Sequence, residues 1–94
     1  MAYLVISKDY ELPESYPVCI REDGFAHFLS PYREDEFVND IKHEIPWGDR
    51  RWNEETLTWS VRLIHLDYFC ERITYWYQSP ALVKDERAEQ VQEG

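Results

Sequence analysis

A chain of 94 residues is long enough for one domain with a single small core, and its formal net charge of −9 opposes broad contact with a phosphate backbone. No apolar run approaches the length of a transmembrane helix, and the short apolar run near the N-terminus lacks the basic flank of a signal peptide. We therefore expect a cytoplasmic domain that makes no contact with a membrane.

The first thirty residues predict β-structure. Residues 3–7 form a short apolar strand, and residues 18–21 and 25–29 read as two paired strands. The Glu-Asp-Gly sequence at 22–24 separates them, and Asp-Gly supplies the positive φ that tight hairpins need. We expect a hairpin here.

A helix is predicted to follow. Ser30 is a suitable N-cap, Pro31 suits the first helical position, and acidic residues in the next turn favour the positive end of the helix dipole. Pro46 and Gly48 end the helix. The stripe expected to face the core consists of Phe37, Val38, Ile41 and Ile45.

The next stretch, residues 41–61, contains two tryptophans around a polar turn. Trp52 and Trp59 lie seven residues apart, and Leu57, Trp59 and Val61 alternate with polar residues at the period of a half-buried strand. This pattern predicts a second hairpin whose returning strand turns these three side chains toward the core.

A second helix is predicted from Leu63 to Tyr77, ended by Ser79-Pro80. Residues 80–94 are charged and lack aromatic residues, so we interpret them as a flexible tail outside a domain spanning residues 1–79. The predicted class is α+β, with a small antiparallel sheet covered on one face by two helices. The expected centre of the core is Phe37, Ile41, Trp59, Val61, Phe69 and Ile73.

The segment IKHEIPWGDRRWNEETLTWSV resembles the HARP-type domain that accompanies annealing helicases. That family has a helix, a tight turn and a W-D-P-x-x-x-x-W-x-V hairpin followed by a helix, and the resemblance covers roughly residues 34–78. Asn53 and Glu54 stand where the family has Asp-Pro. The resemblance implies a module that recognises a DNA substrate, with Arg50, Arg51, Trp52 and Trp59 on the matching positions.

Neither catalysis nor metal binding is predicted. Cys19 and Cys70 lie far apart and outside any CxxC pair, so we expect reduced thiols. His27, His43 and His65 lack the spacing of metal ligands, and there is no nucleophile motif or phosphate-binding glycine loop. We expect no enzymatic activity, no cofactor and no metal.

Three functional interpretations remain open. The first is a small non-catalytic interaction module that binds a protein component of nucleic-acid-processing machinery. Tryptophan and tyrosine offer large contact area at low entropic cost, and arginine beside them is typical of interface hot spots. The surface expected for this role is the hairpin region with Trp47, Arg50, Arg51, Trp52 and Trp59.

The second interpretation is an acidic mimic of DNA that inhibits a DNA-binding protein, as small acidic phage proteins do. Ten acidic residues stand against three basic ones between residues 9 and 44. The residues expected to imitate phosphates are Glu22, Asp23, Glu34, Asp35, Glu36 and Asp40.

The third interpretation is direct recognition of single-stranded or branched DNA. Trp52 or Trp59 would stack on bases while Arg50 and Arg51 hold phosphate. The net charge opposes this interpretation, although residues 45–79 are nearly neutral, with five acidic residues against four basic ones.

Overall fold

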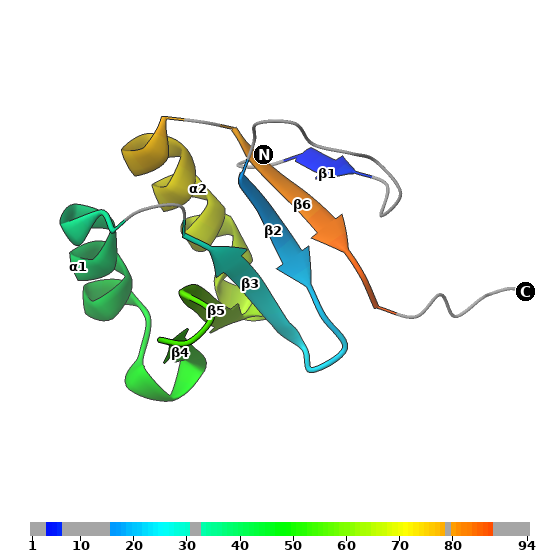
Figure 1. Cartoon of the computed structure of the whole chain (residues 1–94), viewed down its shortest axis with the longest axis horizontal. Coiled ribbons are helices and arrows are strands. Elements are labelled where there is room, and N and C mark those ends of the chain that lie inside the picture. The colour runs from blue at the N-terminus through cyan, green and yellow to red at the C-terminus, as the bar shows by residue number, and fades with distance from the viewer. Residues whose placement is uncertain (1–3, 7–15, 31–32, 79, 88–94) are drawn as a thin grey trace, which may run out of the picture.

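Figure 1 shows the computed structural model of the chain, which describes residues 4–6, 16–30, 33–78 and 80–87. These residues form one sheet with two α-helices on one of its faces. The strands are β1 (Leu4–Ile6), β2 (Tyr16–Ile20), β3 (Phe25–Leu29), β4 (Arg50–Asn53), β5 (Thr58–Arg62) and β6 (Ala81–Asp85). The helices are α1 (Asp35–Glu44) and α2 (Leu66–Tyr77), and the short 3-10 turns η1 (Trp47–Asp49) and η2 (Leu63–His65) precede β4 and α2.

The predicted α+β class, with both helices on one face of the sheet, is confirmed. The strand order is β1-β6-β2-β3-β5-β4, and three of the five pairings in it are antiparallel. Both predicted hairpins form, β2–β3 and β4–β5. Gly24 has a φ of 81° in the first of them, as the Asp-Gly sequence predicts.

The C-terminal part of the sheet corrects the predicted domain boundary. The sequence places residues 80–94 in a flexible tail, but Ala81–Asp85 form β6, which pairs in parallel with β1 on one side and β2 on the other. Ala81 and Val83 are buried in the core. The domain therefore extends at least through β6, and residues 88–94 of the expected tail lie outside the described residues.

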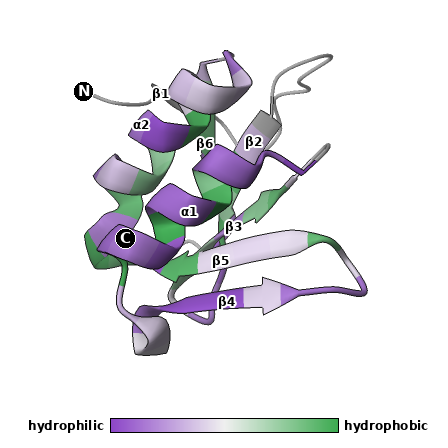
Figure 2. Cartoon of the chain, turned by 90° about the vertical axis from the view of Figure 1, so that its left-hand side faces the viewer, coloured by the Kyte–Doolittle hydropathy of each residue, from purple (hydrophilic) through white to green (hydrophobic). Residues whose placement is uncertain are grey.

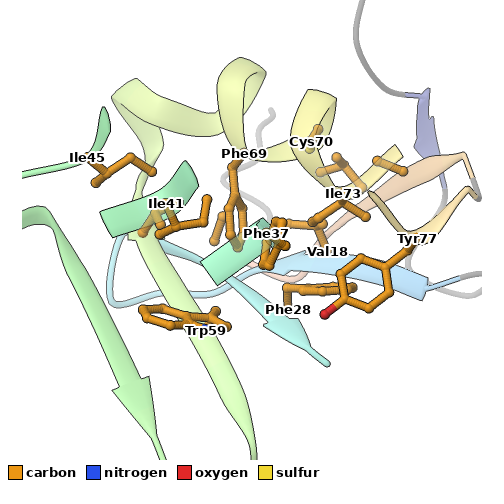
Figure 3. Packing of buried hydrophobic residues seen from close by; sticks show 14 of the residues in the cluster. Val18, Phe28, Phe37, Ile41, Ile45, Trp59, Phe69, Cys70, Ile73 and Tyr77 are labelled. Atoms are coloured by element: carbon orange, nitrogen blue, oxygen red, sulfur yellow. The ribbon is translucent and has the colours of Figure 1, made fainter. Parts of the chain in front are cut away.

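The core lies between the helices and the sheet, and aromatic rings form its centre (Figure 3). Phe28 of β3 packs edge-to-face against Phe37 of α1 and against Phe69 and Tyr77 of α2. The ring centroids are 5.3 to 6.2 Å from that of Phe28, within the range of favourable aromatic pairs. All six residues expected at the centre of the core are buried: Phe37, Ile41, Trp59, Val61, Phe69 and Ile73.

The start of α1 differs from the prediction. Ser30 does not cap the helix, which begins only after Glu34, whose side chain accepts a hydrogen bond from the Glu36 N–H at 3.3 Å. Ser30 is buried instead, with its Oγ 2.7 Å from the Tyr77 hydroxyl. Its hydroxyl therefore ties the end of β3 to α2. Pro31, expected at the first helical position, lies outside the described residues.

The two helices are joined by Asp40 of α1. Its carboxylate accepts hydrogen bonds from the Trp76 indole N–H at 2.7 Å and from the Arg72 guanidinium at 3.1 Å. The hydrogen bond from the Trp76 indole is the main reason that the pKa of Asp40 lies below its ordinary value. Partial desolvation raises this pKa, but the hydrogen bond and the charge of Arg72 lower it further. The ionised carboxylate is thus part of the contact between α1 and α2.

Asp49 fixes the end of the second hairpin. Its carboxylate lies 2.9 Å from His65 Nε2 and 3.1 Å from Arg62 Nε, and so joins η1 to the end of β5 and to η2. α2 then begins without a side-chain cap and ends at Gln78, which adopts the left-handed conformation. In the described part of the chain, neither helix has the length and apolar run that crossing a membrane requires.

Candidate functional site

A groove of about 370 Å³ separates the β4–β5 hairpin from α1. Figure 2 shows the arrangement that creates it: α1 lies over β5, while β4 lies at the margin of the sheet and is mainly hydrophilic. The groove therefore has the helix on one side and the edge strand on the other. It is lined by Ser30, Arg33, Val38, Lys42, Trp52, Glu54, Leu57 and Trp59.

The two hairpin tryptophans occupy different depths of this groove. Trp52 and Trp59 are paired across β4 and β5, and their ring centroids lie 5.2 Å apart. Trp59 is 6% exposed and belongs to the core, whereas Trp52 is 42% exposed. The expectation that both lie on an interaction surface is therefore corrected for Trp59, which forms the floor of the groove and supports Trp52.

Leu57 supplies a second exposed apolar side chain to the groove. The sequence predicts that it turns inward with Trp59, but it lies in the turn before β5, is 52% exposed and has a φ of 54°. A left-handed conformation costs roughly 1–2 kcal/mol for a residue that carries a Cβ. Asn53 Oδ1 holds the turn by accepting the N–H groups of Glu55 and Thr56 at 2.9 and 3.2 Å.

The helix-free face of the sheet carries a second hollow, of about 640 Å³, beside the same edge strand. Successive side chains of a strand point to opposite faces, so Arg51 faces this hollow while Trp52 faces the groove. Ser60 and His27 follow Arg51 across the register of β4, β5 and β3. The lining consists of Arg21, His27, Leu29, Arg51, Trp52, Asn53, Glu54, Thr56, Thr58 and Ser60.

Three side chains in this region form a hydrogen-bonded chain. Ser60 Oγ lies 2.8 Å from His27 Nδ1, and His27 Nε2 lies 3.0 Å from Asp23 Oδ2. Burial raises the pKa of Asp23, but hydrogen bonds from the Phe25 N–H and from His27 outweigh it and lower the pKa below its ordinary value.

This chain has the residue types of a nucleophilic triad but not the setting of one. Ser60 is only 5% exposed and lies in β5, which is paired on both sides. A nucleophilic serine normally stands on a turn, where free backbone N–H groups can stabilise an oxyanion. The arrangement therefore accounts for Ser60 and His27 as hydrogen-bonded polar groups within the sheet.

The two hairpin arginines have different roles. Arg50 donates hydrogen bonds to the backbone carbonyls of Lys42 and Ile45, at the C-terminal end of α1, where a cation interacts favourably with the helix dipole. It is thus engaged within the fold and is not a free contact residue. Arg51 is exposed, with its guanidinium 3.7 Å from the centre of the Phe25 ring.

Trp47 is the most exposed of the large hydrophobic side chains in the described residues, at 83%. It lies in η1, before the start of β4, and lines neither hollow. Trp47 is therefore not part of the groove that Trp52 lines, although the sequence predicts both on one surface.

The acidic residues proposed to imitate DNA are divided between two ends of the fold. Glu22 and Asp23 lie in the turn before β3, and Glu34, Asp35 and Glu36 lie at the start of α1, which follows the opposite end of that strand. The length of β3 thus separates the two groups. Asp40 is bound by Arg72 and Trp76, and Asp35 forms an ion pair with Arg33. These positions do not form the continuous row of free charges that mimicry requires.

The cysteines are not part of either hollow. Burial raises the pKa of the Cys70 thiol to about 12, and Cys70 lies in the core. Burial, followed by the charge of Glu86, raises the pKa of Cys19 as well. Both thiols are therefore protonated and poorly nucleophilic at neutral pH.

The sequence does not predict the exposure of Leu57, the α1 wall of the groove or the hydrogen-bonded chain from Ser60 to Asp23. Asn53 was a local signal that a turn precedes β5, because an asparagine side chain can accept hydrogen bonds from the backbone N–H groups that follow it. Val38 and Lys42 carry no such local signal, since their place in the groove depends on how α1 crosses the sheet.

Comparison with known proteins gives no further support for a family. No family model, no curated protein and no solved structure matches this chain. The resemblance to the HARP-type domain accordingly stays a prediction from the hairpin residues.

Proposed function

We propose that this domain is a non-catalytic interaction module that binds a protein partner through the groove between the β4–β5 hairpin and α1. The observation that carries the proposal is that Trp52 and Leu57 line the groove and are 42% and 52% exposed. Leu57 is kept there in a strained backbone conformation. A stable fold does not require an exposed leucine at a position that favours glycine or asparagine.

The surroundings of Trp52 suit an interface hot spot. Its ring rests on the buried Trp59, so little side-chain freedom is lost when a partner covers it. Covering the rest of a large aromatic side chain stabilises a complex by about 1–2 kcal/mol from apolar area alone. Lys42 and Arg33 supply a polar rim to the groove.

The proposed partner belongs to the machinery that processes nucleic acids. This part of the proposal is supported by the hairpin residues that resemble the HARP-type domain, of which Arg51 and Trp52 are exposed. A protein partner fits better than DNA itself, because Arg50 is engaged at the end of α1 and the chain carries a net charge of −9.

Affinity capture with matched variants tests the proposal. The wild-type domain, Trp52→Ala, Leu57→Asn and Trp47→Ala would each be immobilised and exposed to the same cell lysate. We expect a protein that is retained by the wild type and by Trp47→Ala but lost with Trp52→Ala and Leu57→Asn. Asparagine tolerates the left-handed conformation, so Leu57→Asn removes the apolar side chain without disturbing the turn.

Equal retention of every captured protein by Leu57→Asn and by the wild type would contradict the proposal. Single-stranded DNA added to the lysate provides a further control, because a partner held by the groove stays bound in its presence. Release of the partner by DNA would instead favour the nucleic-acid interpretation.

A further inference from the structure

The strand that borders the groove is also an edge of the sheet. Among the described strands β4 pairs only with β5, so alternate backbone N–H and C=O groups of Arg50–Asn53 point away from β5 toward an edge that no described strand covers. The Arg50 N–H already donates to the Trp47 carbonyl, which leaves the groups that follow it for an added strand. Edge strands of this kind can accept an extended segment of another chain, whose backbone continues the sheet.

The two hollows flank this edge on opposite faces of the sheet. Trp52 and Glu54 contribute to the lining of both. A segment added beside β4 would place alternate side chains on the two faces, one toward the groove and the next toward the second hollow. The placement of the hollows on the two faces therefore suits a strand, whose successive side chains alternate between faces, and not a helix, whose anchors lie on one side every three to four residues.

The two hollows differ in chemistry. The groove offers the apolar surfaces of Trp52, Leu57 and Val38. The second hollow presents hydrogen-bond donors, and its positive charge comes chiefly from Arg51, which is exposed and whose guanidinium carbon lies 3.7 Å from the centre of the Phe25 ring. Glu54 also lines this hollow, and the Arg51 charge helps to lower the pKa of Asp23. Arg21 also lines this hollow, and it forms an ion pair with Glu86, with 3.5 Å between Arg21 Nε and Glu86 Oε1.

We infer that the partner binds as an extended peptide segment that adds to β4 as a further strand, with apolar side chains in the groove and acidic side chains against Arg51. This inference rests on the proposed function and specifies its partner: a segment in which apolar and acidic residues alternate. The charge of Arg51 favours an acidic residue of the segment at that position, in a domain whose net charge of −9 otherwise repels acidic chains.

Selection from a library of random 12-residue peptides displayed on phage tests the inference without assuming a sequence. We expect the selected peptides to share alternating apolar and acidic positions. The consensus peptide, made synthetically, should bind Leu57→Asn at least tenfold more weakly than the wild type, and Arg51→Glu should weaken it by a similar factor. Trp47→Ala, the matched control, should bind it as the wild type does.

Backbone methylation of the peptide gives the sharper readout. If the peptide adds to β4, methylating the amide nitrogen should weaken binding about tenfold at every second residue, because only alternate N–H groups face the edge. Methylation at the residues between them should have little effect. A helical ligand would lose affinity at every central position.

Two results would overturn the inference, and they differ from failure of the proposed function. One is a consensus peptide with apolar residues at helical spacing, or with basic residues, whose binding is still weakened by Leu57→Asn. The groove would then remain the binding site, but strand addition would be excluded. The other is a selection that yields no peptide dependent on Leu57. Lysate capture decides separately whether the groove binds a protein at all.

Discussion

Trp52 and Trp59 are the same residue type at paired positions, but their burial leads us to expect different costs when they are removed. Trp59→Ala should lower the free energy of unfolding by about 3–5 kcal/mol, because Trp59 is 6% exposed and its loss leaves a cavity. Trp52→Ala should cost about 1–2 kcal/mol, since much of that ring already faces water. Urea titration followed by circular dichroism measures both. A loss below about 1 kcal/mol for Trp59→Ala would place that residue outside the core.

For Leu57 we expect a substitution that stabilises the protein. Leu57→Gly should raise the free energy of unfolding by up to about 1 kcal/mol, because glycine adopts the φ of 54° without strain, although its greater freedom in the unfolded chain offsets part of the gain. The same urea titration applies. Thr56→Gly is a matched control in the same turn, and it should be neutral or destabilising because the only positive φ among the non-glycine residues of this turn is that of Leu57. A stability gain with loss of partner binding would show that Leu57 serves binding and not folding.

Asp40 makes the stability of the domain depend on pH. Because folding lowers the pKa of Asp40 below its ordinary value of 3.8, the contribution of the carboxylate is fully present above that value and is lost as the pH falls through the folded-state pKa. Asp40→Asn should therefore be less stable than the wild type by about 1–2 kcal/mol at pH 7, and the difference should shrink below pH 3.8. Urea midpoints at several pH values measure it. The exposed Glu55→Gln variant is the control, and an Asp40→Asn difference that does not change with pH would contradict this role.

At the scale of elements, sequence patterns predicted correctly those helices and strands whose formation depends on neighbouring residues. The periodicity of residues 25–29, the Asp-Gly turn and the apolar stripe of α1 all have short-range causes, and these elements form as expected. Ser30 shows the limit of such patterns. A serine before a helix is a good N-cap in isolation, but here its hydroxyl is 2.7 Å from Tyr77, a partner 47 residues away that no local pattern reveals.

The misassigned element is β6. Only Leu82 and Val83 are strongly apolar in it, and charged residues follow, so composition favours a tail. Its structure comes from partners on both sides, because β1 and β2 supply the hydrogen bonds that its own sequence does not predict. Strand propensity is weaker evidence than pairing for a segment of five residues.

Substitution in β6 tests its place in the domain. Val83→Asp should destabilise the protein by more than about 3 kcal/mol and narrow the chemical-shift dispersion of its amide NMR signals, because it puts an unpaired carboxylate where a side chain is fully buried. Lys84→Ala is the matched control, since the neighbouring side chain points to the other face of the sheet and is half-buried. If Val83→Asp left the urea midpoint unchanged, residues 81–85 would behave as the tail that the sequence suggests.

At the scale of the whole molecule, the candidate site could be predicted only in part. The hairpin and the exposure of Arg51 follow from residues close together in sequence, and both Arg51 and Trp52 belong to the surface that the sequence predicts. The separation of the acidic residues depends on which end of the sheet each loop occupies, and the engagement of Arg50 depends on where α1 ends. Those facts belong to topology, which a single sequence constrains weakly.

The position of β6 between β1 and β2 also fixes an order of assembly. Among the described strands β1 pairs with β6 alone, so the beginning of the chain has no place in the sheet until the segment after α2 has arrived. During synthesis the hairpins and helices of residues 16–78 can form first, while the first strand waits unpaired and the outer side of β2 stays open. Because pairing between segments far apart in sequence slows folding, we expect the pairing of β1 with β6 to be the slow step. A nascent chain that stalls after α2 would therefore expose the side of β2 that β6 later covers, which is where we expect chaperones or neighbouring nascent chains to bind.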